Sequence, residues 1–448
     1  MSKANPWIDR YAALCDLDEI KRRTRVSVTP LNGLGDDAIE LACQRLLNAL
    51  SEVFVPTSAT AMLIQNEIGR AHAHATIYYS DPATILARAN SDLIDIEPYM
   101  PTCFTGPAGT GKTRWRRALA RALGDIGTVP LGQGHGMVPL VPFTSVMVGT
   151  QRSVSQVLRP LARPEIQGGK VRISEADLPG ECALWQAIVG GCLFGVDELQ
   201  FLTQSKDAST LVTVVLQALF GVKTPWFFMA NYSLCWKLMQ RPPESTQRLL
   251  GRPAVLLPDP PGSEDWREIL REYQYVAPEV FAFDLVTREI ELWNYCAGLK
   301  RLLVQLIELT YRDCRRREKF KIVWPDIERG YLSGPYKQNR SDVQKMIAYA
   351  VQGGDLKQDL KCPFEDDAST ESIEKYKAHL RDARHRQVVA ASINASLSVE
   401  ERDRIAEIKK RAAGEVDITP AKVIRLPRVT NRSVAGLLAA GRKFGEEK

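Results

Sequence analysis

Eight consecutive residues carry a complete phosphate-binding motif. The run Gly106-Pro107-Ala108-Gly109-Thr110-Gly111-Lys112-Thr113 matches G-x-x-x-x-G-K-[ST] and lies between a short apolar stretch and a helix-like segment. Glycines at this spacing let backbone N–H groups close around phosphate oxygens, and the following helix directs the positive end of its dipole at them. Lys112 is expected to reach the β- and γ-phosphates, and Thr113 to ligate Mg²⁺. The motif therefore predicts a site for a nucleoside triphosphate with Mg²⁺.

A second apolar stretch ends in two carboxylates. Residues 192–196 are followed directly by Asp197 and Glu198, which together form a Walker-B signature. Asp197 is expected to hold Mg²⁺, usually through water. Glu198 is expected to polarise the water that attacks the γ-phosphate. These residue types in this order predict hydrolysis of the nucleotide as well as its binding.

The hydrophobic pattern indicates which elements must position these residues. A mainly helical accessory region is expected over 1–95, and over 96–260 short apolar runs alternate with helical stretches, as in a parallel sheet with crossover helices. Strands are expected at 102–105, 141–148, 193–196 and 226–230. A helical lid should follow over 261–352, then a linker with charged helices over 353–417 and a flexible basic tail over 418–448. The predicted fold class is thus α/β, a P-loop NTPase core with a helical lid and mainly helical extensions at both ends.

Composition narrows the class of protein. No apolar run approaches the ~18 residues of a membrane span, and the start of the chain lacks the apolar segment of a signal peptide, so we expect a cytoplasmic protein. The net charge of +6 permits contact with nucleic acid without demanding it. The nine cysteines form no C-x-x-C pair, and His72 and His74 have no third ligand nearby in the sequence. We therefore expect reduced, mostly buried thiols and neither a zinc site nor a disulfide framework.

The combination of motifs resembles that of AAA+ ATPases, and four more residues match positions with known roles there. Asn231 ends the stretch over 226–230, where that superfamily places a polar sensor that orients the attacking water; a turn asparagine is the alternative. Arg248 and Arg252 lie in the region that presents an arginine finger to the neighbouring subunit, and either could serve. Arg301, in a G-x-x-R sequence at the start of a lid helix, matches the second sensor, which touches the γ-phosphate from the lid.

Within this superfamily, the chain resembles the TnsC/TniB group, the AAA+ regulators of heteromeric transposases. Gly195-Val-Asp-Glu-Leu-Gln200 is similar to their D-E-[IL]-Q, and Asn5-Pro-Trp-Ile8 to their N-P-x-I element. The lid passage from Trp293 to Tyr331 is similar in layout, so the resemblance covers roughly residues 96–345 and the N-terminal tetrapeptide. The chain departs from the pattern at Asn231, where Gly-Thr is often found.

The resemblance implies an ATP- and Mg²⁺-dependent protein that assembles as a homo-oligomeric ring or helical filament on duplex DNA. Such a regulator links a target selector, which is a sequence-specific protein or an RNA-guided complex, to the transposase subunits. Hydrolysis of ATP at the subunit interfaces then dismantles the assembly. Two alternatives remain open, a replication- or recombination-type AAA+ loader and a signalling or defence ATPase that acts through protein partners alone.

Two basic segments are candidates for DNA contact. The tail from residue 418 carries seven basic residues against two acidic ones, and it is expected to bind DNA, to serve as a peptide docked by the transposase, or to be a solvated end. The cluster from Arg312 to Lys319 ends a predicted lid helix. Because cations suit the C-terminal end of a helix dipole, we expect a solvated helix end there, with nucleic-acid contact as the alternative.

Overall fold

The computed structural model describes residues 5–80, 96–130, 136–149, 153–199, 208–364 and 370–412. The chain divides into two compact units, Met1–Ala390 and Ala391–Lys448. None of the helices in the described ranges is both long and apolar enough to cross a membrane. The expected basic tail over 418–448 lies outside the described residues.

A five-stranded parallel sheet forms the centre of the first unit, in the order β4-β5-β6-β1-β7. Its strands are β1 Thr102–Thr105, β4 Thr144–Met147, β5 Phe194–Asp197, β6 Trp226–Met229 and β7 Pro253–Val255. All four predicted strands are present, and the α/β class is confirmed. The sequence did not indicate β7, or the antiparallel hairpin of β2 Gly127–Pro130 and β3 Met137–Leu140. All three strands are short, each contains a proline, and none is buried at every position, so they lack the buried run of a central strand.

Both faces of the sheet are covered, which is why β1, β5 and β6 are buried at every position. Successive side chains of β1 enter different cores, since Cys103 belongs to one hydrophobic cluster and Phe104 to another. The Cys103 face packs against α7 Val154–Leu158, α9 Leu178–Ile188, α10 Ala208–Phe220 and α11 Tyr232–Met239. The Phe104 face packs against α1 Pro6–Asp9, α4 Ser58–Tyr78 and α6 Lys112–Leu123.

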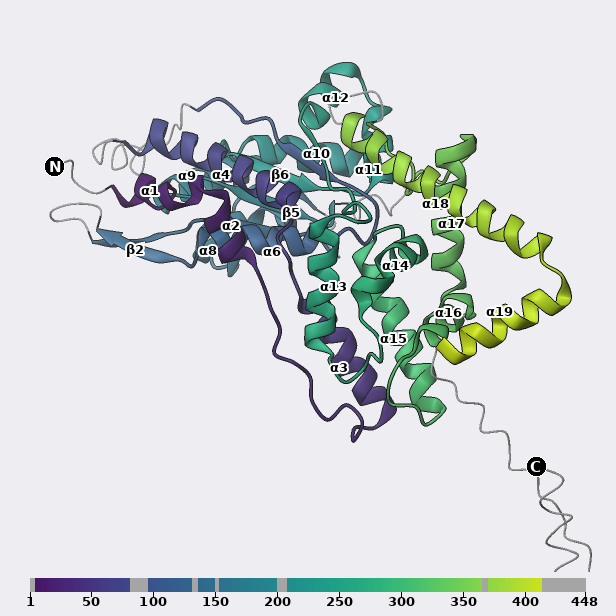
Figure 1. Cartoon of the computed structure of the whole chain (residues 1–448). Coiled ribbons are helices and arrows are strands. Elements are labelled where there is room, and N and C mark those ends of the chain that lie inside the picture. The colour runs from purple at the N-terminus through teal and green to yellow at the C-terminus, as the bar shows by residue number, and fades with distance from the viewer. Residues whose placement is uncertain are drawn as a thin grey trace, which may run out of the picture. The chain divides into compact units, whose positions relative to one another are not determined.

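The lid is helical, as predicted. It contains α13 Glu264–Val276, α14 Glu289–Cys296, α15 Lys300–Arg316, α16 Trp324–Leu332 and α17 Lys337–Gln352. An N-terminal helix, α3 Ile39–Glu52, packs in the same hydrophobic cluster and lies beside α13 and α15 (Figure 1). The helices α2 Leu17–Thr24 and α4, in contrast, pack on the sheet side. The N-terminal region therefore contacts both the α/β core and the lid, and the chain between α3 and α4 passes from one to the other.

One arginine near the end of α15, Arg315, is buried rather than solvated, so the sequence-based expectation is wrong for it. The buried guanidinium of Arg315 donates hydrogen bonds to the carbonyl oxygens of Gly35 and Asp37, at 3.0 and 2.9 Å, and to that of Leu34. Arg312 pairs with Glu308 at 2.6 Å. The sequence could not indicate this arrangement, because the loop that covers the helix end lies almost 280 residues away along the chain. The Arg315 side chain therefore holds the N-terminal segment on the lid.

Replacing Arg315 by methionine should lower the free energy of unfolding by about 3 kcal/mol, because the buried carbonyl oxygen of Leu34 and the partly buried ones of Gly35 and Asp37 lose a charged donor. Urea unfolding followed by circular dichroism measures the change. Arg316→Met is the matched control, since the Arg316 side chain is 62% exposed and makes only a long contact, at 3.9 Å, with the carboxylate of Glu40. Equal losses in the two variants would contradict a specific role for the buried guanidinium.

The C-terminal helices are α18 Thr370–Ser396 and α19 Val399–Ala412. A capping box precedes α19, since the Ser398 amide donates to Glu401 Oε2 at 2.8 Å and the Glu401 amide donates to Ser398 Oγ at 3.3 Å.

Candidate nucleotide-binding site

The phosphate-binding loop leaves the carboxyl end of β1 and leads into α6, which begins at Lys112. Gly106 has φ +157°, and a Cβ there would lie 2.3 Å from the carbonyl oxygen of Leu256, so only glycine fits. Gly109 has φ +99° and faces the lid. Gly111 is the N-cap of α6 and offers no side-chain acceptor to the first turn. The first amides of α6 are therefore available to an anion at the loop.

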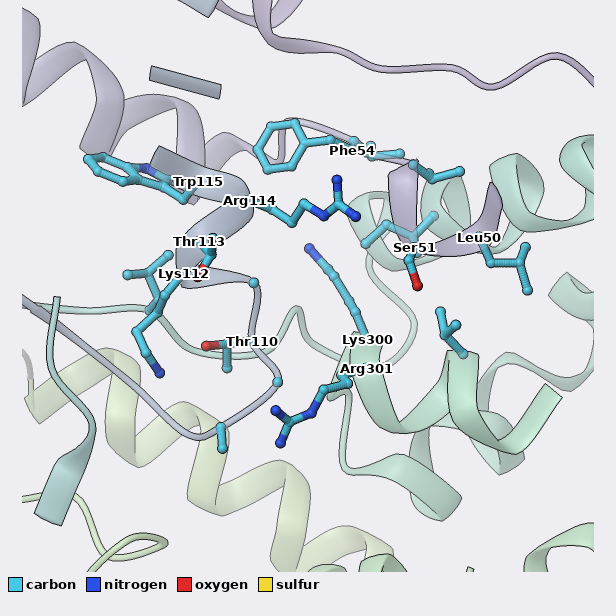
Figure 2. A pocket seen from close by; sticks show the side chains of 18 of the residues that line it. Leu50, Ser51, Phe54, Thr110, Lys112, Thr113, Arg114, Trp115, Lys300 and Arg301 are labelled. Carbon is cyan, nitrogen blue, oxygen red and sulfur yellow. The ribbon is translucent and has the colours of Figure 1, made fainter. Parts of the chain in front are cut away.

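Lys112 is the buried cation of this loop. Its ammonium donates to the carbonyl oxygens of Gly106 and Pro107, at 2.8 and 3.2 Å. Burial lowers the pKa of Lys112 to about 8, and the positive charge of Arg301 acts in the same direction. A bound phosphate would counteract both effects. The side chain of Thr113, the expected Mg²⁺ ligand, lines the same cavity next to Lys112 (Figure 2).

Asp197 is the last residue of β5 and Glu198 follows it, and the two carboxylates have different environments. Asp197 is buried, and its Oδ2 accepts a hydrogen bond from Arg116 Nε at 3.1 Å. Its Oδ1 accepts one from the Glu198 amide at 2.8 Å. Glu198 lines the cavity, and its φ of +61° is a conformation that non-glycine residues rarely adopt. Asp197 is thus fixed behind the site, where contact with a metal through water suits it, whereas Glu198 faces the cavity.

Arg116 was not recognised from the sequence as part of the site. It lies one turn after Lys112 on α6, is 9% exposed, and donates to the hydroxyl of Ser145 as well as to Asp197. One ion pair therefore joins the helix after the P-loop to the strand that carries the carboxylates. Because both partners are nearly fully buried, loss of either would leave an uncompensated charge.

Arg301 brings the lid to the P-loop. Its amide donates to the carbonyl oxygen of Gly109 at 3.3 Å, and a Cβ on Gly109 would lie 3.1 Å from Arg301 Cβ. The neighbouring Lys300 pairs with Asp259 at 3.0 Å. Arg301 lies at the loop that carries Thr110 (Figure 2). The structure therefore places the predicted second sensor within reach of a phosphate held by the loop.

Asn231 also lines the cavity, at the end of β6. Its side-chain oxygen accepts a hydrogen bond from the Leu234 amide at 2.9 Å and caps α11. The side-chain NH2 group of Asn231 is thus the group that would contact a phosphate or a water. Asn231 is thus a helix N-cap and not the turn asparagine of the alternative interpretation, and its position at the cavity also suits a sensor.

Arg248 and Arg252 are not at this cavity. Arg248 lies on α12 Pro243–Leu250, and Arg252 immediately precedes β7, at the edge of the sheet where the strands begin. Both are exposed. The structure does not bring them to the P-loop of their own chain, so they can act on a nucleotide only in another subunit.

The cavity itself has a volume of about 630 Å³ and a wall that the sequence did not indicate. Opposite the P-loop, apolar side chains from three separate segments converge: Leu47, Leu50, Val53, Phe54 and Val55 of the N-terminal region, Ile269 and Tyr273 of α13, and Val304 of α15. Figure 2 shows Phe54 and Leu50 on this wall. The N-terminal region therefore completes the site, with an apolar compartment beside a phosphate loop.

The histidines and cysteines lie elsewhere. His74 Nδ1 is 2.9 Å from the hydroxyl of Tyr99, and no group of three potential metal-binding side chains occurs among the residues that the structure describes. All nine cysteines are free thiols, and eight of them are buried.

Comparison with models of protein families found no match, and comparison with curated proteins found none either. Among solved structures, the Aeropyrum pernix ORC1 protein in complex with DNA is 16% identical, covering 68% of this chain and 77% of that chain, with a TM-score of 0.36. The Aeropyrum pernix ORC2 protein is 14% identical, covering 70% and 84%, with a TM-score of 0.36. The Thermotoga maritima RuvB Holliday junction branch migration motor is 13% identical, covering 71% and 87%, with a TM-score of 0.34. Similarity this low carries no functional conclusion. By its own sheet order, P-loop and helical lid, the chain has an α/β P-loop core followed by a helical lid.

Proposed function

We propose that this chain is an ATPase whose bound ATP controls its assembly on duplex DNA. The observation that carries the proposal is the convergence of the P-loop, Glu198 and Arg301 on one cavity. The triphosphate would lie along residues 106–113, with Lys112 at the β- and γ-phosphates and with Thr113 and Asp197 holding Mg²⁺. Glu198 would orient the attacking water, and the Asn231 amide would contact the water or the γ-phosphate.

The apolar compartment is the proposed site of the base. A purine ring is flat and largely apolar on its faces, and the aromatic rings of Phe54 and Tyr273 and the side chain of Val304 offer matching surface. Since these residues belong to the N-terminal region, α13 and α15, a bound nucleotide would join the core, the lid and α3. Loss of the γ-phosphate would remove the contacts to Arg301 and change that junction.

The proposal that subunits assemble is supported by two arginines that lie outside the cavity. Arg248 and Arg252 are exposed and remote from their own P-loop, as an arginine finger acting on a neighbouring subunit must be. We propose that one of them completes the ATP site of the next subunit, so that a ring or filament forms only around ATP. Contacts with DNA phosphates would then be independent of base sequence.

Within this class, we propose a regulator of transposition that connects a target selector to the transposase subunits. Support comes from the motifs similar to the TnsC/TniB group. In the N-P-x-I element, the Asn5 side chain accepts from the Trp7 amide at 3.1 Å and caps α1, and Trp7 packs on Gly190. Gln200 of the D-E-L-Q sequence lies outside the described residues.

The test is the affinity of the protein for fluorescently labelled duplex DNA of unrelated sequences, measured by anisotropy with a non-hydrolysable ATP analogue, with ADP and without nucleotide. The proposal predicts binding at least about tenfold tighter with the analogue, similar for all sequences, and weakened by salt. Equal affinity in the three nucleotide states would contradict it. Retention of heteromeric transposase subunits on the DNA-bound protein then tests the link to transposition, and no retention would favour an AAA+ loader.

A further inference from the structure

After the lid, the chain returns to the α/β core and then to the lid again. We call residues 356–364 and 370–383 the strap. Cys362, Phe364 and Ile373 belong to the hydrophobic cluster beside the sheet, whereas Tyr376 and Leu380 belong to that of the lid. The strap is also held by hydrogen bonds, since Trp236 Nε1 of α11 donates to the carbonyl oxygen of Lys361 at 3.0 Å, and Arg381 Nε donates to that of Ala350 at 2.7 Å. The strap is thus a further connection between the core and the lid, in addition to the N-terminal region and the chain that leads into α13.

Tyr376 is a buried strap residue that contacts the lid. Its hydroxyl donates to the carbonyl oxygen of Ala297 at 3.0 Å, and its ring lies edge to face with Trp293 at 6.2 Å. Burial raises the pKa of Tyr376, so the hydroxyl keeps its proton and remains a donor. Tyr376 also lines a small cavity together with Pro107 of the P-loop. Tyr376 of the strap therefore contacts the lid and shares a small cavity with the P-loop.

The acceptor of this bond lies in a strained turn. Ala297 has φ +51° and Gly298 φ +71°, and the turn that they form ends α14 and leads into α15. A left-handed conformation is unfavourable for alanine, so the surrounding structure must hold it. Gly298 has no room for a side chain, because a Cβ there would lie 2.6 Å from Trp293 Nε1 and 2.8 Å from Pro258 Cβ. The direction in which α15 starts therefore depends on the packing around Ala297 and Gly298.

Arg301 lies in the first turn of α15, only three residues after Gly298, and its amide bonds to Gly109. We propose that Tyr376 is a positioning residue of the ATPase site, which fixes the Ala297–Gly298 turn and through it holds Arg301 at the P-loop. The inference rests on the proposed function, because Arg301 serves catalysis only when a triphosphate occupies the loop.

The test combines Tyr376→Phe, Arg301→Ala and the double variant. Tyr376→Phe removes only the hydroxyl and should lower kcat about fivefold, the effect of one buried hydrogen bond, while the Kd for ATP changes less than about twofold. In the Arg301→Ala background, the same substitution should leave kcat unchanged, because the residue acts through Arg301. The rate of phosphate release gives kcat, and titration with a fluorescently labelled ATP analogue gives the Kd.

The matched control is Tyr79→Phe, which removes a buried hydroxyl that donates to the carbonyl oxygen of Ala187 at 3.2 Å, away from the lid. This variant should keep the wild-type kcat. A fivefold loss in both the wild-type and Arg301→Ala backgrounds would overturn the positioning role, as would no loss in the wild type. If the wild-type protein itself binds and hydrolyses no ATP, the proposed function fails before the inference is reached.

Discussion

Lys112→Ala is expected to abolish ATP binding, with a Kd raised by about a hundredfold or more. The ammonium is the buried cation nearest to the expected phosphates, and charge-assisted hydrogen bonds are among the strongest in proteins. Calorimetric titration with ATP and Mg²⁺ measures the loss. Arg117→Ala is the matched control, because Arg117 is an exposed cation on the same helix and does not line the cavity. Wild-type affinity in Lys112→Ala would place the triphosphate elsewhere.

The same lysine predicts how the affinity depends on pH. Its pKa of about 8 in the empty cavity means that the ammonium is largely present at pH 7 and largely lost at pH 9. Since the phosphates bind the charged form, the affinity for ATP should fall as the pH rises through 8, and binding near pH 8 should take up a proton. Titrations in buffers of different ionisation enthalpy detect that proton. An affinity for ATP that stays constant between pH 7 and pH 9 would contradict this prediction.

Glu198→Gln should keep ATP binding and lower kcat by about a hundredfold or more, because an amide cannot polarise the attacking water as a carboxylate does. The variant should therefore remain on DNA after ATP is added, for much longer than the wild-type protein. Phosphate release and the lifetime of the DNA complex test both statements. Glu244→Gln, which changes an exposed carboxylate on α12, is the control. Hydrolysis by Glu198→Gln at the wild-type rate would show that a group other than Glu198 polarises the attacking water.

The local parts of the site could be predicted from the sequence. A P-loop needs glycines and a lysine at fixed spacing, and a carboxylate pair after a buried strand needs only the strand before it. Both patterns lie within a few residues of chain, so β1, the start of α6, β5 and Glu198 were recognisable. The lid arginine was also placed correctly beside the loop, because its G-x-x-R sequence is local too.

The tertiary parts could not be predicted. Arg116 belongs to a helix with several arginines, and nothing in that pattern shows that this one is buried against Asp197. Phe54 and Tyr273 are separated by more than 200 residues and look like ordinary core residues until the fold brings them to one cavity. The bond of Tyr376 to Ala297 likewise joins residues 79 positions apart. Each contact depends on how helices pack, which no short sequence pattern specifies.

The central claim is that ATP at this P-loop controls assembly on DNA. Negative-stain electron microscopy of the full chain with duplex DNA tests it most directly, with ATP, a non-hydrolysable analogue, ADP or no nucleotide. Rings or filaments on DNA with the analogue, fewer with ATP, and none with ADP or without nucleotide are the predicted result. Single subunits in all four conditions would contradict the account and favour an ATPase that acts through protein partners alone.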